Sequence, residues 1–397
     1  MKIALIQNNL SPYRIPLFET LARMPDVDFT LLLMAPDKPS YPSWKFDAQD
    51  LPFRAIIVPG WRIVNSHLAQ ICINPGLLPL LRRETPDAII CCGFSLSTLF
   101  VVIHSLFAGT PIIIWMEGTE VTEGLRRTPG IRRVLRRWIA RKASGFVLAG
   151  QLSREYIESL MPKGYKKPMR ISYNCVDTEK LSGDCNAFRA SGENWESFRR
   201  RFPAKNILFS GRLVELKGIR EMIQVYQRVL QRCGERVGLI ILGEGEMRQD
   251  IEELKRKEGL KDIFLEGFIG PDGYFKYFAV ADVFILLSHT DCNPLVVFEA
   301  LSCGLPLICT NKAGNAPDFV HDGVTGFIVN PEDIEGATEK VLTILNSLES
   351  IGGEKSRQMV QKANYRDSAK AFLEIAAEVI AQNGQHASNV STPPVKR

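Results

Sequence analysis

The stretch that decides the fold lies in the second half of the chain and reads Asp282-Val283-Phe284-Ile285-Leu286-Leu287-Ser288-His289-Thr290-Asp291-Cys292-Asn293-Pro294-Leu295-Val296-Val297-Phe298-Glu299. Residues 282–287 are mostly apolar and predict a buried strand, and the end of the stretch predicts a short helix. Proline is favoured at the first helical position, because the N–H that it lacks would have no partner within the helix. We therefore expect Pro294 to begin the helix, with Asn293 as its N-cap.

The start of this predicted helix is suited to an anion. Leu295 and Val296 carry N–H groups without an intrahelical acceptor, at the positive end of the helix dipole, where phosphate groups bind readily. Asp291 before the helix and Glu299 within it add carboxylates, which accept hydrogen bonds from hydroxyl groups. The combination suits a ligand with phosphate at its centre and polyols at both ends, such as a nucleotide sugar. A structural role is the alternative, because acids near helix starts stabilise the dipole.

The composition is that of a globular protein large enough for two domains. The chain has 397 residues, of which 45% are hydrophobic. Nine cysteines include no C-x-x-C pair and no cluster with histidine, which predicts a reducing compartment and no structural zinc site. Residues 1–6 read directly into a strand, so we expect no signal peptide and a cytoplasmic location. We also expect no metal, no cofactor and no nucleic-acid partner.

An uncharged segment over residues 88–116 is long enough to cross a membrane. Gly93, Gly109 and Pro111 divide it into pieces that are typical of a strand, a helix and a strand. We interpret it as the core of a strand-helix-strand unit rather than as a transmembrane helix.

Strand-like runs alternate with helical patterns along both halves of the chain, which predicts parallel sheets covered by helices on both faces. The expected strands are residues 2–7, 28–34, 54–59, 88–92, 111–116, 145–149 and 170–174, then 206–209, 237–242, 263–268, 282–287, 305–310 and 326–329. Helices are predicted between many of them, for example over residues 12–23, 76–84, 95–107 and 219–233. The fold class is therefore α/β, with two tandem Rossmann-like doubly wound domains facing a central cleft.

The domain boundaries follow from the same pattern. We expect an N-terminal domain over residues 1–180 and a C-terminal domain over residues 205–382, with the option that its last helix crosses back to the first domain. Residues 181–204 are polar and lack an apolar period, which predicts a linker. Residues 383–397 are polar and predict a disordered tail. Ligands of open parallel sheets bind at the carboxyl ends of the strands, so the loops there carry the candidate site.

Two loops of the second domain carry candidate donor-binding residues. The loop after its first strand contains Gly211, Arg212 and Lys217, and these two cations can close on a diphosphate. The next strand ends in Gly243-Glu244-Gly245, where glycines let the backbone approach a ligand or simply form a tight turn. No complete G-x-G-x-x-G follows the first strand of either domain, which argues against a dinucleotide-dependent dehydrogenase.

The first domain places acids at the end of a strand. Residues 111–116 lead to Glu117 and Glu120, and a carboxylate there can contact a sugar hydroxyl or accept the proton of an acceptor. A solvated loop acid is the alternative. The loop after the first strand is expected at the same edge and adds the candidate acceptor-binding residues Asn9, Ser11, Tyr13 and Arg14.

Positive charge is concentrated in the first half of the chain. Residues 1–180 hold 23 Lys and Arg against 15 Asp and Glu, whereas the remainder holds 26 against 29. Eight of the basic residues lie between Arg126 and Lys142, and among them recur, at helical spacing, Ile131, Val134, Leu135, Trp138 and Ile139. A basic amphipathic helix of this kind can lie on an anionic surface, which predicts a peripheral position on the inner face of the cell membrane. Packing of the apolar stripe on the sheet is the alternative.

An ordered set of motifs in the second domain resembles the family 4 retaining glycosyltransferases of GT-B fold, also called glycosyl transferases group 1. The set consists of Gly211-Arg212-Leu213 with Lys217-Gly218, then Gly243-Glu244-Gly245, the acid-x7-Glu element Asp291 to Glu299, and Asp322-Gly323-Val324-Thr325-Gly326-Phe327. The resemblance covers nearly the whole second domain. In the first domain it is thinner and rests on residues 11–18 and 174–177.

By this resemblance, Arg212 and Lys217 hold the donor diphosphate, Asp291 the transferred sugar and Glu299 the ribose. The catalytic set is then Arg212, Lys217, Asp291 and Glu117. The donor-binding set is Gly211, Gly243, Glu244, Gly245, Cys292, Asn293, Pro294, Leu295, Val296 and Glu299. Three positions depart from the family pattern: Asp291 replaces the usual Glu, Pro294 removes an N–H that glycine would offer, and Glu117 stands where many members carry His.

The implied activity is metal-independent, retaining transfer of a sugar from a UDP- or GDP-sugar to a glycan or lipid-linked glycan. Cell-surface polysaccharide or glycolipid synthesis is the implied pathway. Two alternatives stay open. One is a nucleotide-sugar epimerase of the same fold, and the other is a non-catalytic subunit that binds a nucleotide sugar.

Overall fold

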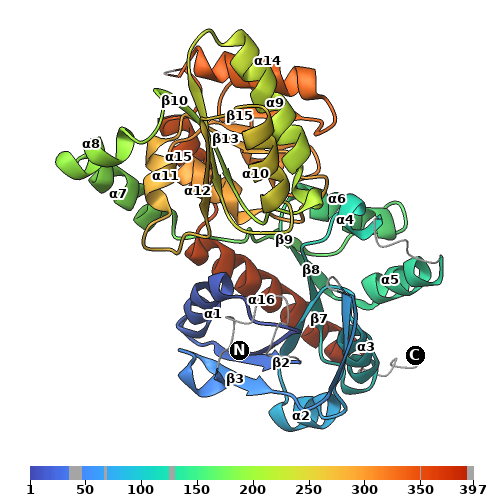
Figure 1. The fold of residues 1–397 in the computed structure, drawn as a ribbon. Helices are drawn as coiled ribbons and strands as arrows, with labels where there is room; N and C mark the ends of the chain where they lie inside the picture. Colours follow the sequence, from blue (N-terminus) through green and yellow to red (C-terminus); the bar gives the residue numbers. More distant parts are fainter. Residues whose placement is uncertain (35–46, 67–68, 125–129, 349, 391–397) are drawn as a thin grey trace, which may run out of the picture. The chain divides into compact units, whose positions relative to one another are not determined.

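The computed structural model describes residues 1–34, 47–66, 69–124, 130–348 and 350–390. The chain forms two compact units, of which unit 1 comprises Met1–Cys175 with Tyr365–Arg397 and unit 2 comprises Val176–Asn364. Each unit is built on a parallel sheet (Figure 1). The prediction of two Rossmann-like α/β domains is therefore confirmed for each unit by itself.

The sheet of unit 1 has seven parallel strands in the order β3-β2-β1-β6-β7-β8-β9. These strands are β1 (Lys2–Gln7), β2 (Asp28–Leu33), β3 (Arg54–Ile57), β6 (Ala88–Cys92), β7 (Ile112–Met116), β8 (Gly145–Leu148) and β9 (Met169–Ile171). Strand β1 pairs with β2 on one side and with β6 on the other. The strand order therefore reverses between β1 and β6, which makes this position the switch point of the sheet.

Helices cover both faces of the unit 1 sheet. They are α1 (Ile15–Ala22), α2 (Leu77–Glu84), α3 (Leu96–Ala108), α4 (Glu120–Gly124), α5 (Gly130–Lys142), α6 (Gln151–Leu160) and α16 (Tyr365–Val390), with short 3-10 turns at Pro12–Arg14 and Ala48–Asp50. Side chains of α2, α3, α5 and α6 form one buried core, and those of α1 and α16 form the other. The uncharged segment 88–116 is buried as β6, α3 and β7, and none of the described helices is long and apolar enough to cross a membrane.

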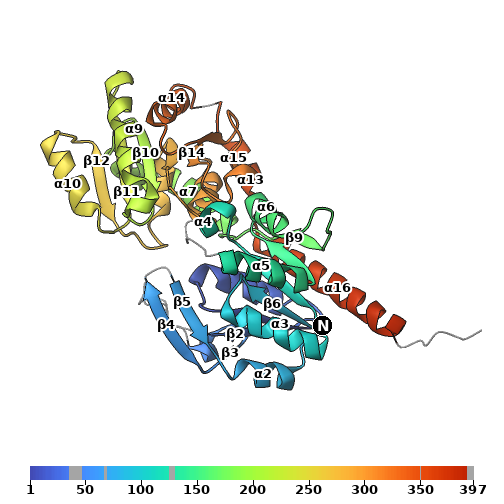
Figure 2. The same ribbon diagram turned by 90° about the vertical axis from the view of Figure 1, so that its right-hand side faces the viewer.

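A hairpin of unit 1 was not predicted. Strands β4 (Trp61–Ser66) and β5 (Ala69–Ile73) form a separate antiparallel pair (Figure 2). Its apolar residues Trp61, Ile63 and Ile71 are exposed rather than buried. Because residues 61–63 are all exposed, this part of β4 lacks the alternation of buried and solvated positions by which an antiparallel strand is predicted.

The last helix belongs to unit 1. Helix α16 contributes Phe372, Ile375 and Val379 to the same core as β1 and α1, and Phe372 packs edge to face on Trp115 with ring centroids 5.0 Å apart. The option that this helix crosses back to the first domain thus matches the division into units. The helix continues to Val390, so residues 383–390 are helical where a disordered tail was predicted, and residues 391–397 lie outside the described range.

The sheet of unit 2 has six parallel strands in the order β12-β11-β10-β13-β14-β15. They are β10 (Lys205–Ser210), β11 (Val237–Leu242), β12 (Ile263–Gly267), β13 (Val283–Leu286), β14 (Leu307–Thr310) and β15 (Gly326–Val329). The helices are α7 (Thr178–Arg189), α8 (Glu193–Arg199), α9 (Ile219–Arg232), α10 (Arg248–Lys257), α11 (Phe275–Val280), α12 (Leu295–Ser302), α13 (Ala316–Phe319), α14 (Ile334–Leu345) and α15 (Glu354–Val360), and a 3-10 turn spans Glu215–Lys217. Helices α9 and α14 pack together on one face, whereas α11, α12 and α15 cover the other (Figure 1).

Residues 181–204, predicted as a linker, instead form most of α7 and α8 within unit 2. Leu181 and Cys185 are buried, and α7 packs against α11 and α12. Phe188 makes edge-to-face contacts with Trp195 and Phe198, with centroids 5.8 and 5.5 Å apart. A few buried residues and an aromatic cluster hold this polar segment in place, which a periodicity criterion does not detect.

Candidate functional site

The candidate donor site lies at the switch point of the unit 2 sheet. Strand β10 pairs with β11 on one side and with β13 on the other, although β13 follows it by more than seventy residues. Ligands of open α/β sheets bind beyond the carboxyl ends of the strands at such a point. The loops that leave β10 and β13 here are residues 211–218 and 287–294, which carry the predicted catalytic residues Arg212, Lys217 and Asp291.

Contacts along the backbone hold these two loops together. Gly218, the residue before α9, has φ +67°, and a Cβ atom there would lie 2.0 Å from the carbonyl oxygen of Leu287. The N–H of His289 donates to the carbonyl of Leu216 at 3.0 Å. Only glycine permits so close an approach with this backbone conformation. The sequence thus specifies a fixed pair of loops at the switch point.

Lys217 and Asp291 are joined directly across this pair of loops. The ammonium group of Lys217 is ion-paired and hydrogen-bonded to the carboxylate of Asp291, and the two side chains are only 19% and 15% exposed. The backbone of Asp291 is also fixed from a third loop, because its N–H donates to Lys312 O at 3.2 Å and its carbonyl accepts from Gly314 N–H at 2.9 Å. A cation for phosphate and an acceptor for hydroxyl groups therefore stand side by side in a defined position.

Arg212 lies in the same loop and is exposed to solvent. Within the described residues, its guanidinium group has no ion pair. An exposed guanidinium at a strand end can supply two parallel N–H donors to a phosphate. The two cations therefore differ in their partners: Lys217 is ion-paired with Asp291, whereas Arg212 has no ion pair among the described residues.

The helix after β13 begins one residue later than predicted. Pro294 is the N-cap of α12, with ψ 116°, so Leu295 is the first helical residue and Asn293 precedes the cap. The carbonyl of Pro294 accepts from Asn315 Nδ2 at 2.9 Å, which holds the residue in its extended conformation. The N–H groups of Leu295 and Val296 remain the first two of the helix and point to its positive end. Cys292, just before them, is exposed.

Glu299 lies inside α12, one turn beyond these N–H groups, and is half-buried. Burial raises the pKa of its carboxyl group to about 7. Burial also raises the pKa of Tyr274, and the charge of Glu299 raises it further. At neutral pH the carboxyl of Glu299 is therefore partly protonated and can donate as well as accept a hydrogen bond, which suits contact with a diol.

The glycines after β11 shape the site from behind. Gly243 has φ +132°, and a Cβ atom there would lie 1.9 Å from the carbonyl oxygen of Gly211. The N–H of Leu213 donates to Glu244 O at 2.9 Å. Because Gly243 and Gly245 have no side chain, the backbone of the loop after β10 can pack directly against them. The side chain of Glu244 is exposed and ion-paired with Arg248. These glycines thus fit the β11 loop against the cationic loop.

The candidate acceptor site lies at the switch point of unit 1. Arg14 is 7% exposed, and its guanidinium is ion-paired with the carboxylate of Glu117 at the end of β7. The guanidinium carbon lies 4.5 Å from the ring centroid of Trp115 and 5.5 Å from that of Tyr13, and Nη1 lies 3.9 Å from Cys92 Sγ. Burial lowers the pKa of Arg14, and the neighbouring Glu117 and Tyr13 raise it by more, so that it stays charged. Glu117 is thus held by a buried cation rather than solvated.

The other residues predicted for this site divide into two groups. Ser11 is buried, and Tyr13 is half-buried with its pKa raised by burial, so both lie close to Arg14. Glu120 begins α4 and contacts Ser159 at 3.4 Å and Arg133 at 3.8 Å. Glu120 is therefore not brought to the pair of Arg14 and Glu117, whereas Tyr13 is.

One residue of this site was missed from the sequence. Gln7 ends β1 at the switch point, is 3% exposed, and neither polar atom of its amide has a hydrogen-bond partner among the described residues. In the strand register Ile6 pairs with Cys91, and the next residue of β6, Cys92, pairs with Trp115, whose indole N–H is likewise buried without a partner among the described residues. A polar residue at the end of an otherwise apolar strand is the signal that could have identified Gln7.

Neither site groups ligands for a metal within the described residues, since no three His, Cys, Asp or Glu side chains come together there. Independence of a metal ion remains a prediction from the family resemblance.

Comparison with known proteins gives a family match over part of the chain and similar folds over almost all of it. Residues 195–366 match the family described as Glycosyl transferases group 1. A sulfoquinovosyl transferase from Arabidopsis thaliana is 30% identical over 154 residues, which are 38% of this chain and 29% of that protein. The match spans less than half the length of this relative and of two further ones.

Two solved structures are similar over almost the whole chain. The apo form of the lipopolysaccharide outer core galactosyltransferase WaaB has a TM-score of 0.71 at 15% identity and covers 95% of this chain and 99% of its own. HepE from Anabaena, solved in complex with UDP-glucose, has a TM-score of 0.61 at 18% identity and covers 98% of this chain and 100% of its own. The predicted GT-B fold class is thereby confirmed.

Proposed function

We propose that the chain transfers a sugar from a nucleotide diphosphate sugar to an acceptor, with retention at the anomeric carbon, because residues 195–366 match the glycosyl transferases group 1 family. The observation that carries the proposal is the pairing of Lys217 with Asp291 at the switch point of unit 2, beside the first N–H groups of α12 and Arg212, which has no ion pair among the described residues. These groups match the diphosphate and the sugar hydroxyls of such a donor.

Each part of the donor has a counterpart in unit 2. The diphosphate is held by Arg212, Lys217 and the N–H groups of Leu295 and Val296, and the ribose hydroxyls by Glu299. When phosphate draws Lys217 away, the carboxylate of Asp291 becomes available to a hydroxyl of the sugar. The structure of HepE with UDP-glucose supports a UDP-sugar as the donor, and GDP-sugars are the second class to test.

The reaction that these groups support exchanges one bond at the anomeric carbon for another. The bond to the β-phosphate oxygen breaks, the bond to the acceptor oxygen forms on the same face, and the acceptor proton passes to the departing diphosphate. Negative charge grows on the diphosphate during this step, so Arg212, Lys217 and the helix N–H groups lower the barrier electrostatically. Retention through this front-face route rests on the family resemblance.

The acceptor is proposed to bind at the switch point of unit 1. The carboxylate of Glu117, the phenol of Tyr13 and the amide of Gln7 can hydrogen-bond to the hydroxyls of a glycan. Arg14 acts as a positioning residue, because its ion pair holds the carboxylate of Glu117 in place. The similarity to a lipopolysaccharide outer core galactosyltransferase supports a glycan or lipid-linked glycan as the acceptor class.

An anionic membrane surface is the second proposed partner. On α5 the side chains of Ile131 and Val134 are 76% and 64% exposed, and Arg132 and Arg133 beside them are exposed as well. Only Ile139 and Ala140 of this helix are buried, with Trp138 packed against the core, so the predicted stripe is divided between solvent and core. Arg126 and Arg127 of the predicted basic segment lie outside the described residues.

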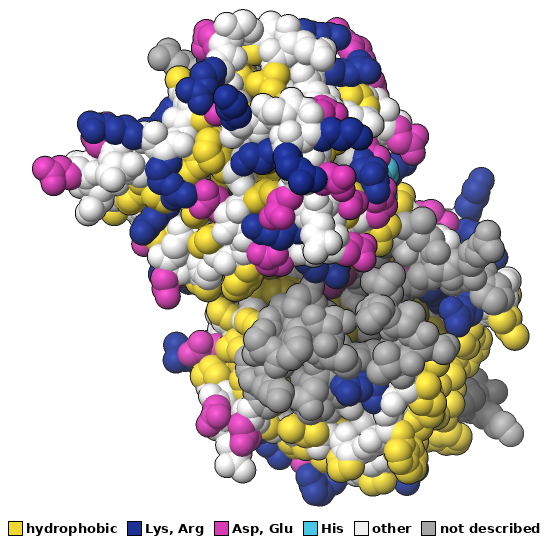
Figure 3. Space-filling model, in the orientation of Figure 1, with side chains coloured by type: hydrophobic (Ala, Val, Ile, Leu, Met, Phe, Trp, Pro, Cys, Tyr) yellow, Lys and Arg dark blue, Asp and Glu magenta, His cyan; other side chains and the backbone are white. Residues whose placement is uncertain are grey.

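Neighbouring elements extend this exposed apolar surface. Leu106 and Phe107 at the end of α3, which contacts α5, are 55% and 86% exposed. Figure 3 shows hydrophobic side chains gathered on the side of unit 1 that carries α3 and the β4-β5 hairpin. Apolar side chains flanked by arginine are the pattern that binds at the interface of an anionic bilayer, which supports a peripheral location on the inner face of the cell membrane.

The test of transfer is release of nucleoside diphosphate from UDP-, GDP- and ADP-sugars in the presence of glycan and lipid-linked acceptors. We expect Arg212→Ala and Lys217→Ala each to lower turnover by about 100-fold, by analogy with loss of one oxyanion donor. The exposed Arg256→Ala and Lys261→Ala of the same unit are matched controls that retain activity. Full activity of both site variants would refute the assignment.

Two further arms distinguish the alternative functions. An isomerised sugar after incubation of donor alone would indicate an epimerase instead. Donor binding without release of nucleoside diphosphate to any acceptor or to water would indicate a non-catalytic subunit.

A further inference from the structure

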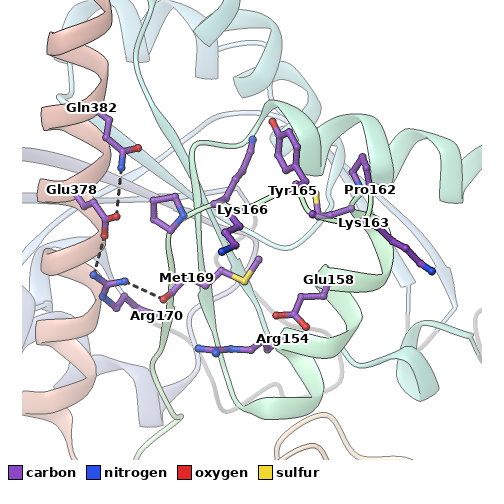
Figure 4. A pocket seen from close by; sticks show the side chains of 14 residues that line it. Arg154, Glu158, Pro162, Lys163, Tyr165, Lys166, Met169, Arg170, Glu378 and Gln382 are labelled. Atoms are coloured by element: carbon purple, nitrogen blue, oxygen red, sulfur yellow. Dashed lines mark hydrogen bonds and ion pairs between the residues drawn. The ribbon is translucent and has the colours of Figure 1, made fainter.

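A second pocket of unit 1, of about 820 Å³, lies apart from the switch point. It is an open pocket lined by the loop of residues 161–168, helix α6, strand β9 and helix α16 (Figure 4). The loop joins the end of α6 to the start of β9, so it lies at the amino edge of the parallel sheet. Tyr13, Arg14 and Glu117 follow strand ends at the opposite, carboxyl edge. The pocket is therefore not part of the candidate acceptor site.

Basic side chains predominate in the lining of this pocket. Five of them, Arg154, Lys163, Lys166, Lys167 and Arg170, stand against two acids, Glu158 and Glu378. Its volume is in the range of ligand-binding pockets and exceeds that of a single phosphate ion. The side chains that line it come from helix α6, the loop, strand β9 and helix α16 (Figure 4).

Two of the five cations are satisfied within unit 1. Arg170 is paired with Glu378 at 2.9 Å and with Glu374 at 3.4 Å, both on α16. Lys167 donates to carbonyl groups at the end of α5, among them that of Arg141 at 2.7 Å. Arg170 thus fastens one wall to α16, and Lys167 fastens the loop to α5.

The remaining cations have no such partners. Within the described part of the chain, Arg154, Lys163 and Lys166 have no ion pair, although Glu158 lies one turn from Arg154 on the same helix. The Nε atom of Arg154 is buried without a hydrogen-bond partner. A buried guanidinium N–H that lacks an acceptor is destabilising, and an anion in the pocket would pair with the charge of the guanidinium group that lines it.

We propose that this pocket binds a phosphate or sulfonate group carried by a larger polar molecule. Arg154 provides the planar guanidinium that holds two oxygen atoms of the anion, and Lys166 and Lys163 provide point charges at the mouth. Glu158 accepts hydrogen bonds from hydroxyl groups of the same ligand. The headgroup of an anionic lipid and a soluble sugar phosphate or glycerol phosphate share this chemistry. Lys167 connects the loop to α5, the helix proposed to bind a membrane, so a lipid headgroup is tested beside a soluble phosphate.

The experiment uses the full chain with the donor site saturated by UDP, and probes it with glycerol 3-phosphate and with phosphatidylcholine vesicles that do or do not contain phosphatidylglycerol. Calorimetry measures the soluble probe and co-sedimentation measures the vesicles. We expect Arg154→Gln and Lys166→Gln each to weaken binding of the responsive probe by about 10-fold or more, whereas Arg154→Lys weakens it less. The exposed Arg82→Gln on α2 is the control and leaves binding unchanged.

The two sources give different results. A lipid site shows loss of vesicle binding in Arg154→Gln and Lys166→Gln, and a site for a soluble phosphate shows loss of glycerol phosphate binding with vesicle binding unaltered. The proposal is overturned if neither probe distinguishes these variants from the wild type, or if Arg82→Gln loses as much. Thermal unfolding of each variant confirms that it is folded, and none of these outcomes depends on transferase activity.

Discussion

The carboxylate of Asp291 and the ammonium of Lys217 neutralise each other at the ends of two neighbouring strands, 74 residues apart in the chain. By the family resemblance Lys217 serves the diphosphate and Asp291 the transferred sugar, so in the unliganded chain the two expected binding groups bind one another. Phosphate must therefore compete with Asp291 for Lys217. This competition makes the first prediction specific.

Asp291→Asn should separate affinity for nucleotide from turnover. The substitution releases Lys217, so we expect tighter binding of UDP, whereas sugar transfer falls by about 100-fold because a carboxylate contact to the sugar is lost. Calorimetry with UDP and initial rates with the sugar donor measure the two effects. The exposed Asp272→Asn is the control. Unchanged affinity for UDP in Asp291→Asn would show that the ion pair does not compete with phosphate.

Glu117→Gln should destabilise unit 1. It leaves the guanidinium of Arg14 buried without its anion, and loss of one member of a buried pair costs about 3–5 kcal/mol. Urea unfolding, followed through the transition of unit 1, measures the difference in free energy of unfolding. Glu120→Gln, at the exposed acid that begins α4, should change it by less than about 0.5 kcal/mol. Equal stability of both variants would mean that the pair contributes nothing.

The stability of unit 2 should depend on pH through Glu299. Because burial raises the pKa of this carboxyl to about 7, the folded chain binds more protons than the unfolded chain between the ordinary pKa of 4.5 and about pH 7. Its stabilising contribution is complete below that window and is lost as pH rises through it, by at most about 1.4 kcal/mol per pH unit. Glu299→Gln removes the loss, so the variant gains stability relative to the wild type from pH 4.5 to pH 7.

Urea unfolding at a series of pH values checks this result. The exposed Glu246→Gln should show no such trend. A constant difference between Glu299→Gln and the wild type across the window would mean that Glu299 titrates normally.

Gly243→Ala should disturb the donor site through its support. A methyl group at this position would meet the carbonyl of Gly211 at 1.9 Å, and the backbone conformation is itself unfavourable for alanine. We expect a loss of several kcal/mol in stability, or displacement of the loop with Arg212 and at least about 10-fold weaker UDP binding. Gly270→Ala, where a Cβ atom meets nothing within 4 Å, is the control. Tolerance of alanine at both positions would contradict the role given to Gly243.

The sequence predicted the strands well, because a buried parallel strand is a short apolar run bounded by loops. It predicted less well where the structure depends on distant residues. Pro294 caps α12 instead of beginning it, since its conformation is fixed by a hydrogen bond from Asn315. Residues 181–204 are helical because α11 and α12 cover their few apolar side chains. Neither the position of the cap at Pro294 nor the helices over residues 181–204 can be predicted from the local pattern of apolar residues.

Much the same holds for the two sites. Each candidate loop could be located, because loops at the carboxyl ends of parallel strands are where ligands bind. The sequence could not predict which side chains of these loops contact one another, because those contacts depend on the order of the strands in the sheet. Arg14 and Glu117 are 103 residues apart, and although both were candidates, nothing in the sequence pairs them until β1, β6 and β7 are aligned. Gln7 becomes noticeable only when its burial is known.

The return of the chain into unit 1 has a consequence for folding. Helix α16 supplies Phe372, Ile375 and Val379 to the core that also contains β1 and α1, so the first strand and the last helix must meet before that core is complete. Unit 2 lies between them as one continuous segment and can fold without waiting for either. Unit 1 therefore has the long-range contacts that slow folding, and it leaves apolar surface uncovered in the meantime. Deletion of residues 365–390 should consequently cause aggregation through unit 1 while unit 2 still binds UDP.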